Sequence, residues 1–138
     1  MSQRTVNLLL VEDDEVDILN VQRAFRKANI ANPFWSARDG IEGLELLRSG
    51  AVPLNSLLVL LDLNMPRMNG IEFLRELRRD TRLAHLPVVV LTTSDDERDR
   101  IDAYNLNVAG YIVKPVTFGN FVDAMVTLNR YWTLVEMP

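Results

Sequence analysis

Four apolar runs of strand length recur along this chain of 138 residues. They are Val6 to Val11, Leu57 to Leu61, Pro87 to Leu91 and Gly110 to Val113. Short runs with so few polar interruptions are typical of strands that are covered on both faces, as in a parallel sheet. A weaker run, Pro33 to Ala37, fits an edge strand because proline lacks the amide hydrogen that a central ladder needs. The pattern predicts five strands.

Segments of helical length and period separate these runs. They are Asp14 to Asn29, Ile41 to Ser49, Ile71 to Arg79, Asp95 to Asn105 and Phe118 to Thr133. Strand and helix therefore alternate along the chain, and right-handed crossovers place helices on both faces of the sheet. The order predicts an α/β fold with a doubly wound, five-stranded parallel sheet.

Apolar positions within the helical segments predict which side chains are buried. The last segment has the strongest apolar stripe, formed by Phe118, Phe121, Val122, Met125, Leu128 and Trp132. In the third segment, Arg75, Arg78 and Arg79 are expected on the solvent side. The fourth segment has few apolar anchors beyond Ile101 and Tyr104, so we expect it to be loosely held.

Composition and charge exclude several classes of function. With 48% hydrophobic and 25% charged residues, the chain is typical of a globular protein, and its length predicts a single domain, 1–138, with a short tail at 134–138 and no output domain. A net charge of −4 offers no basic face for nucleic acid or an anionic membrane. The absence of cysteine excludes disulfides and thiolate sites, and together with the lack of a hydrophobic leader it favours a cytoplasmic location.

Polar residues stand where the predicted strands end. Glu12 and Asp13 follow the first strand, Asp62 the third, Thr92 the fourth and Lys114 the fifth. Ligands of doubly wound sheets bind at the carboxyl ends of the strands, so we expect these side chains to converge. Clustered carboxylates repel unless a cation lies among them, and oxygen ligands with room for water favour Mg²⁺. With a lysine and a hydroxyl available for phosphate oxygens, the set is suited to phosphoryl transfer.

Each of these residues has a simpler interpretation when it is taken alone. Acidic residues favour the first turn of a helix, so Glu12 to Asp14 could mark only a helix start, and Asp14 is expected to be its cap. Asp62 could simply end a strand, and Lys114 with Pro115 could form a turn with a solvated lysine. Their joint occurrence at the expected strand ends favours the functional interpretation.

Four segments of the chain, LLLVEDD, LLDLNMPRMNG, VVVLTTS and YIVKP, resemble in order and spacing the signature segments of bacterial response-regulator receiver domains. The resemblance implies the flavodoxin-like (βα)5 receiver fold. It also implies that Asp62 accepts a phosphoryl group from the phosphohistidine of a sensor histidine kinase. Mg²⁺ would be bound by Asp13, Asp62 and the backbone carbonyl of Asn64, with Glu12 acting through water.

The same resemblance implies roles for residues on the fourth and fifth strands. Thr92 and Lys114 would hold the phosphoryl oxygens, and Tyr111 would be the switch aromatic that turns inward when Thr92 moves. Thr93 is bulkier than the small residue usual in the family, which implies slower access to the phosphoryl group. The protein would be a switch that catalyses only its own phosphorylation and dephosphorylation, and not an enzyme with a separate substrate.

A narrower resemblance concerns partners. The string PVVVLTTS, the stretch Tyr104 to Leu106 and the pair Tyr131 and Trp132 resemble the stand-alone receivers that serve cyanobacterial and bacterial phytochromes. This implies a phytochrome as the kinase, together with a downstream protein partner that the sequence does not name. An exposed apolar patch of Tyr131, Trp132, Leu134 and Val135 would suggest a homodimer through the face formed by the fourth helix, fifth strand and fifth helix.

Three other functions were compared with this one. A phosphatase of the haloacid-dehalogenase type also uses a strand-end aspartate with Mg²⁺, but it needs a second aspartate two residues on, where this chain has Asn64. A flavodoxin-like binding module would need a hydroxyl- and glycine-rich loop after the first strand, in place of the acids Glu12 to Asp14. A phosphorylation-independent pseudo-receiver is the remaining alternative, disfavoured because every key position is filled.

Overall fold

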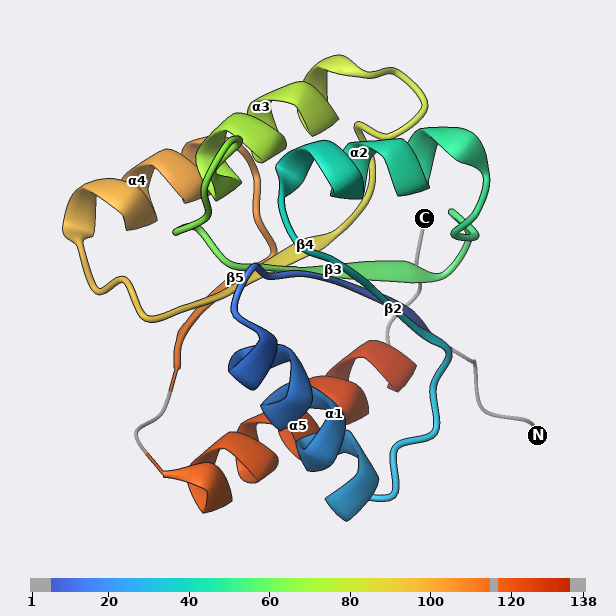
Figure 1. Ribbon diagram of the computed structural model, residues 1–138, viewed down its shortest axis with the longest axis vertical. Helices are drawn as coiled ribbons and strands as arrows, with labels where there is room; N and C mark the ends of the chain where they lie inside the picture. Colours follow the sequence, from blue (N-terminus) through green and yellow to red (C-terminus); the bar gives the residue numbers. More distant parts are fainter. Residues whose placement is uncertain (1–5, 115–116, 135–138) are drawn as a thin grey trace.

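The computed structural model describes residues 6–114 and 117–134, in which strands and helices alternate (Figure 1). The strands are β1 (Asn7–Val11), β2 (Phe34–Ala37), β3 (Leu57–Leu61), β4 (Val88–Thr92) and β5 (Gly110–Val113). The helices are α1 (Glu15–Lys27), α2 (Gly40–Ser49), α3 (Gly70–Arg79), α4 (Glu97–Asn105) and α5 (Phe118–Leu134). Among these residues, no helix is long and apolar enough to cross a membrane.

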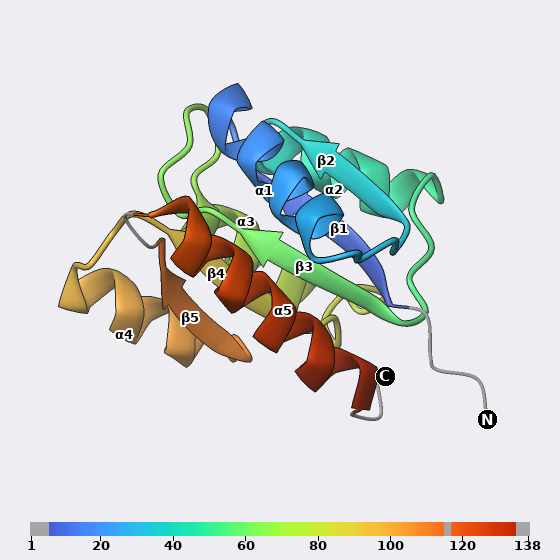
Figure 2. The same ribbon diagram turned by 90° about the horizontal axis from the view of Figure 1, so that it is seen from below.

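The five strands form one parallel sheet in the order β2-β1-β3-β4-β5. Helices α1 and α5 cover one face, and α2, α3 and α4 cover the other (Figures 1 and 2). The predicted doubly wound fold is confirmed, including the edge position of β2. Strand order reverses at β1 and β3, the place where such sheets bind ligands.

Two hydrophobic clusters, one on each face of the sheet, form the core. Successive residues of a strand point to opposite faces, so Leu9 and Val11 of β1 enter the cluster under α2 and α3, whereas Leu8 and Leu10 enter the cluster under α1 and α5. Every residue of β3 and β4 is buried. The continuous apolar runs in the sequence reflect this burial on both sides.

Polar caps set where the helices begin. Asp14 caps α1 as predicted, its Oδ1 accepting a hydrogen bond from the Val16 amide at 2.8 Å. Asp96 caps α4 by accepting from the Arg98 amide at 2.7 Å, so this helix begins two residues later than the predicted Asp95. At the other end of α1, Asn29 adopts a left-handed φ of 58°, and the helix has already ended at Lys27.

Three side chains of α4 and α5 test the predictions of burial. Ile101 and Tyr104 do not anchor α4, because about half of each side chain is exposed, and the small Ala103 is the residue of α4 that packs inward. Trp132 is buried in the cluster under α1 and α5, which confirms its predicted place in the apolar stripe of the last helix and excludes it from the exposed patch. Its neighbours include Leu8 of β1, Leu58 of β3 and Phe25 of α1.

The predicted tail is also revised. Leu134, expected to begin the tail, is the last residue of α5, and Val135 lies outside the described residues, as does the rest of the tail. Of the four residues expected to form an apolar patch, Tyr131 and Leu134 are exposed. The described part of that patch is therefore smaller than predicted.

Arg78 was expected in solvent and is half-buried instead. Its guanidinium donates to the carbonyl oxygens of Leu106 at 2.8 Å and Leu86 at 2.7 Å, and to those of Ala84 at 3.0 Å and Asn107 at 3.1 Å. Loop carbonyls away from water need donors, and the long arginine stem lets the charged group reach them. Arg78 thus ties α3 to the segment that joins α4 and β5.

Candidate functional site

An acidic cluster lies at the carboxyl ends of β1 and β3. Glu12, Asp13 and Asp62 each offer one carboxylate oxygen, and these oxygens lie within 4.8 Å of one another. Glu12 is 1% exposed and Asp62 is 5% exposed, while Asp13 reaches solvent. The pairing of β1 with β3 brings the carboxylates together, because Val11 lies opposite Leu61 in the register.

The electrostatics of this cluster favour a cation. Burial raises the pKa of Glu12 to about 8; a hydrogen bond and the charge of Asp62 add to the rise, and contact with Lys114 opposes it. A carboxyl group whose pKa is raised by burial and a neighbouring carboxylate is stabilised in its charged form when a divalent cation binds. The donor set, three carboxylates with one open to solvent, therefore fits a hard cation such as Mg²⁺.

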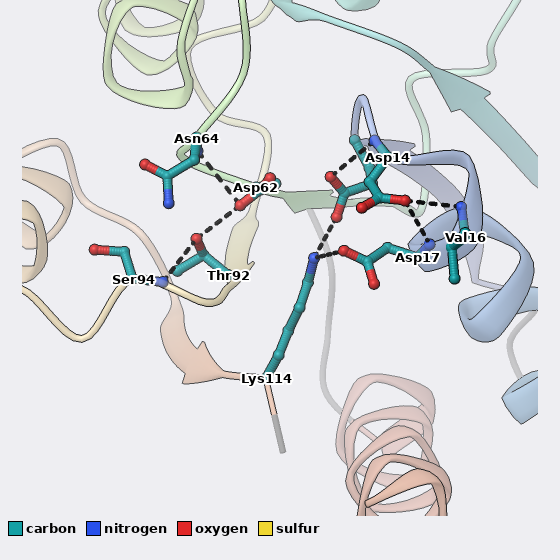
Figure 3. A network of polar contacts seen from close by, with 9 residues as sticks. Asp14, Val16, Asp17, Asp62, Asn64, Thr92, Ser94 and Lys114 are labelled. Atoms are coloured by element: carbon teal, nitrogen blue, oxygen red, sulfur yellow. Dashed lines mark hydrogen bonds and ion pairs between the residues drawn. The ribbon is translucent and has the colours of Figure 1, made fainter. Parts of the chain in front are cut away.

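Thr92 contacts Asp62 directly, as Figure 3 shows. The Thr92 hydroxyl is fully buried and donates to Asp62 Oδ1 at 2.7 Å, and the same hydroxyl accepts from the Ser94 amide at 3.3 Å. The Asn64 amide also donates to Asp62 Oδ1, at 3.4 Å. The structure thus places Thr92 and Asn64 beside Asp62, and a metal-ligand role for the Asn64 carbonyl stays a prediction.

The Lys114 side chain contacts the site on the side opposite Thr92 and Asn64 (Figure 3). Its Nζ forms ion pairs with Glu12 and with Asp17, the latter at 2.7 Å, and its side chain is only 11% exposed. Within residues 6–114 and 117–134, it has no hydrogen bond or ion pair to Asp62. Sequence analysis missed Asp17; the available signal was an acidic residue in the first turn of the helix that leaves the site.

Tyr111 is linked to the loop that follows Thr92. Its hydroxyl donates to the Ser94 carbonyl at 3.0 Å, and the Ser94 hydroxyl donates to Asp99 of α4 at 2.6 Å. The Arg100 guanidinium lies 5.5 Å from the centroid of the Tyr111 ring, within cation–π range. Partial burial raises the pKa of the Tyr111 phenol. One loop residue, Ser94, therefore connects the site to both α4 and β5.

The loop after Asp62 is tied to α2 by an ion pair that sequence analysis also missed. The Arg67 Nε donates to Asp39 Oδ2 at 2.8 Å, and Asp39 caps α2 by accepting from the Glu42 amide at 2.9 Å. Burial would raise the pKa of Asp39, but the hydrogen bonds from Glu42 and Arg67 and the Arg67 charge lower it below its usual value. No motif or spacing in the sequence relates Arg67 to Asp39, which stands 28 positions earlier.

Gly70 lies against the backbone of the site. A Cβ atom on Gly70 would lie 2.6 Å from the Asp62 carbonyl oxygen and 2.7 Å from Leu63 Cα, distances that real Cβ atoms do not tolerate. A glycine is therefore needed at this position for α3 to begin so close to the end of β3.

A hollow of about 600 Å³ opens beside Lys114, between the starts of α1 and α5. It is lined by Asp17, Asn20, Arg23, Thr93, Lys114, Thr117, Phe118 and Phe121. Thr93 is exposed here, and its predicted effect on access to a phosphoryl group stays a prediction.

Comparison with known proteins adds to this geometry. The sequence profile of the family described as "Response regulator receiver domain" matches residues 8–126. The probable methanogenesis regulatory protein FilR2 of Methanothrix harundinacea is 36% identical over 127 residues, which is 91% of this chain and 82% of that protein. Response regulator Rcp1 of Synechocystis is 34% identical over 128 residues, which is 91% of this chain and 87% of Rcp1.

Solved structures show the same architecture. The phosphorylated cyanobacterial phytochrome response regulator RcpA superposes with a TM-score of 0.87 at 32% identity, covering 98% of this chain and 99% of RcpA. The Mn²⁺-bound form of Rcp1 superposes with a TM-score of 0.85 at 33% identity, covering 96% of this chain and 99% of Rcp1.

Proposed function

The chain belongs to the family of response regulator receiver domains, and on that premise we propose that it accepts a phosphoryl group on Asp62 from the phosphohistidine of a sensor histidine kinase. The observation that carries the proposal is the cluster of Glu12, Asp13 and Asp62, whose oxygens lie within 4.8 Å, with the Thr92 hydroxyl already bonded to Asp62. In the transfer, an Asp62 oxygen bonds to phosphorus as the phosphorus–nitrogen bond of the donor breaks.

A divalent ion fits the acidic cluster, and we propose Mg²⁺. Asp13, Asp62 and the Asn64 carbonyl would hold it, with Glu12 acting through water. When bound, it supplies positive charge that neutralises the oxygens of the transferred group. The Mn²⁺-bound form of the related Rcp1 supports a divalent cation in this family.

The chain's own residues then respond to the new charge. The Thr92 hydroxyl, which donates to Asp62 in the resting state, would donate to a phosphoryl oxygen instead, and the Lys114 ammonium would contact another. Since the Ser94 amide donates to Thr92 and the Ser94 carbonyl accepts from Tyr111, a shift of Thr92 is passed to β5. Tyr111 would turn inward, and the face formed by α4, β5 and α5 would change partners.

The partners follow from the relatives. The phytochrome response regulator RcpA and its relative Rcp1 support a phytochrome as the kinase, whereas the name of FilR2, a probable methanogenesis regulatory protein, supports a different signal. The exposed Tyr131 and Leu134 on α5 support a homodimer or a downstream protein on the α4, β5 and α5 face. We infer a cytoplasmic phospho-accepting switch and not an enzyme acting on a separate substrate.

The test is intact mass after treatment with acetyl phosphate and Mg²⁺. We expect a gain of one phosphoryl group that is lost with EDTA and in Asp62→Asn, and retained in the matched control Asp123→Asn, an exposed aspartate of α5. No gain in the wild-type protein, with beryllofluoride also failing to bind, would favour the alternative of a phosphorylation-independent interaction module.

A further inference from the structure

The ammonium of Lys114 is held on the α1 side of the site. Figure 3 shows its side chain extending to meet Asp17, while Thr92 and Asn64 contact Asp62 from the other side. The Lys114 Nζ to Asp17 Oδ2 distance is 2.7 Å, and the side chain of Asp17 is 31% exposed. Two of the three ammonium donors are thus directed at carboxylates, neither of which is Asp62.

The position of Asp17 in the first turn of α1 does not by itself account for its contact with Lys114. Acidic residues favour the first turn, and α1 has Glu15 there as well as Asp17. Glu15 is largely exposed and pairs with Arg38, so it has the helix-dipole role without contact to the site. Asp17 differs because its carboxylate is directed at the one lysine that follows β5.

Asp17 also differs from the other carboxylate that holds Lys114. Glu12 belongs to the cluster whose oxygens lie within 4.8 Å, so a bound cation would compete with the lysine for its charge. Asp17 is not a member of that cluster. With a divalent ion in place, Asp17 is therefore the carboxylate that still holds Lys114 in its resting position.

We propose that Asp17 is a positioning residue: its ion pair with Lys114 is a latch that keeps the ammonium away from Asp62 until a phosphoryl group arrives. The inference rests on the proposed function. In the phosphorylated state the ammonium leaves Asp17 for a phosphoryl oxygen, so the resting ion pair opposes phosphorylation. Removing the carboxylate of Asp17 then favours the state in which Lys114 contacts the phosphoryl group.

The experiment measures the dissociation constant of beryllofluoride, a mimic of the aspartyl phosphate, at saturating Mg²⁺. Asp17→Asn keeps the shape of the side chain and removes its charge; we expect about two- to fivefold tighter binding, which corresponds to the loss of a partly exposed ion pair. Asp17→Glu retains a carboxylate and should restore an affinity close to that of the wild type. Glu15→Gln removes the same charge from the same helical turn without contacting Lys114, and should leave the affinity unchanged.

Each result discriminates. Tighter binding in Asp17→Asn, with Asp17→Glu and Glu15→Gln close to the wild type, supports the latch. Equal changes in Asp17→Asn and Glu15→Gln would overturn the latch, because long-range charge would then account for the effect. Unchanged or weaker binding in Asp17→Asn would overturn it as well. If the wild-type protein itself fails to bind beryllofluoride with Mg²⁺, the proposed function fails instead, and the same titration shows it.

Discussion

Helices α4 and α5 both flank β5, yet they are attached to it in different ways. Helix α5 buries Phe121, Met125 and Trp132 in the core cluster on its side of the sheet. Among the nine residues of α4, all of them described, only Ala103 is buried. Polar contacts hold α4 instead: the Ser94 hydroxyl bonds to its first turn, and Arg78 binds the carbonyls that follow its last turn.

This difference teaches how one side of a small domain can move while the other stays fixed. Shifting α5 would expose apolar surface, at a cost of about 25 cal/mol for each Å². Shifting α4 exchanges polar contacts that water can replace, and a single such contact contributes only about 1 kcal/mol net. A switch that begins at Asp62 therefore acts most easily through α4.

The largest change in the free energy of unfolding is expected from a variant that weakens the apolar packing of α5. Met125→Ala removes a fully buried side chain, and we expect the free energy of unfolding to fall by about 2–5 kcal/mol in urea titrations. Arg130→Ala, at an exposed position of the same helix, should stay within about 0.5 kcal/mol of the wild type. Similar losses in the two variants would show that α5 is not held by its apolar face.

The next effect concerns the end of α4. Arg78→Met keeps the length of the side chain and leaves four carbonyl groups without their donor, so we expect a loss of about 1–3 kcal/mol. Hydrogen exchange should rise in 105–108 and stay unchanged in α5. Arg79→Met, which changes an exposed neighbour, serves as the control. A uniform rise in exchange would contradict a local role for Arg78.

A smaller effect is expected at the start of α4. Ser94→Ala removes the hydroxyl that donates to Asp99, and we expect a loss of about 0.5–1.5 kcal/mol, with faster hydrogen exchange in the first turns of α4. Asp99→Asn should weaken the same hydrogen bond, so the double variant should be less destabilised than the sum of the two single variants. Full additivity would mean that the contact does not hold the helix.

The smallest effect completes the comparison. Ile101→Ala truncates an apolar residue of α4 that is 50% exposed, and we expect a change within about 0.5 kcal/mol, far below that of Met125→Ala. The measurement is the same urea titration. A loss above about 2 kcal/mol, the range for buried side chains, would mean that α4 is anchored by apolar packing after all.

The sheet could be predicted because its strands are buried on both faces. Continuous apolar runs such as Leu57 to Leu61 have one interpretation at that length, and the alternation with helices leaves few topologies. The same topology predicted that Glu12, Asp62 and Thr92 would meet, because strands that run parallel end at one edge. Helix α1 begins one residue later than predicted and α4 two residues later, because Asp14 and Asp96 are the caps that precede these helices.

What could not be predicted depends on long side chains and their distant partners. The sequence separates Arg78 from Leu106 by 28 positions and Lys114 from Asp17 by 97, and no periodicity relates them. Arginine and lysine near a helix end are usually solvated, so the helical pattern predicted an exposed Arg78. The same pattern assigned no role to Asp17. The exposure of Ile101 could not be predicted either, because it depends on which face of α4 packs inward.

Gly70 has a consequence for genetics. A screen for loss of signalling would be expected to return substitutions at Gly70 beside those at Asp62, because any added carbon would collide with the Asp62 carbonyl. Such alleles would resemble active-site alleles although the position carries no functional group. A second-site substitution would rarely restore function, because the added carbon would collide with main-chain atoms of Asp62 and Leu63. A smaller side chain elsewhere would not remove that collision.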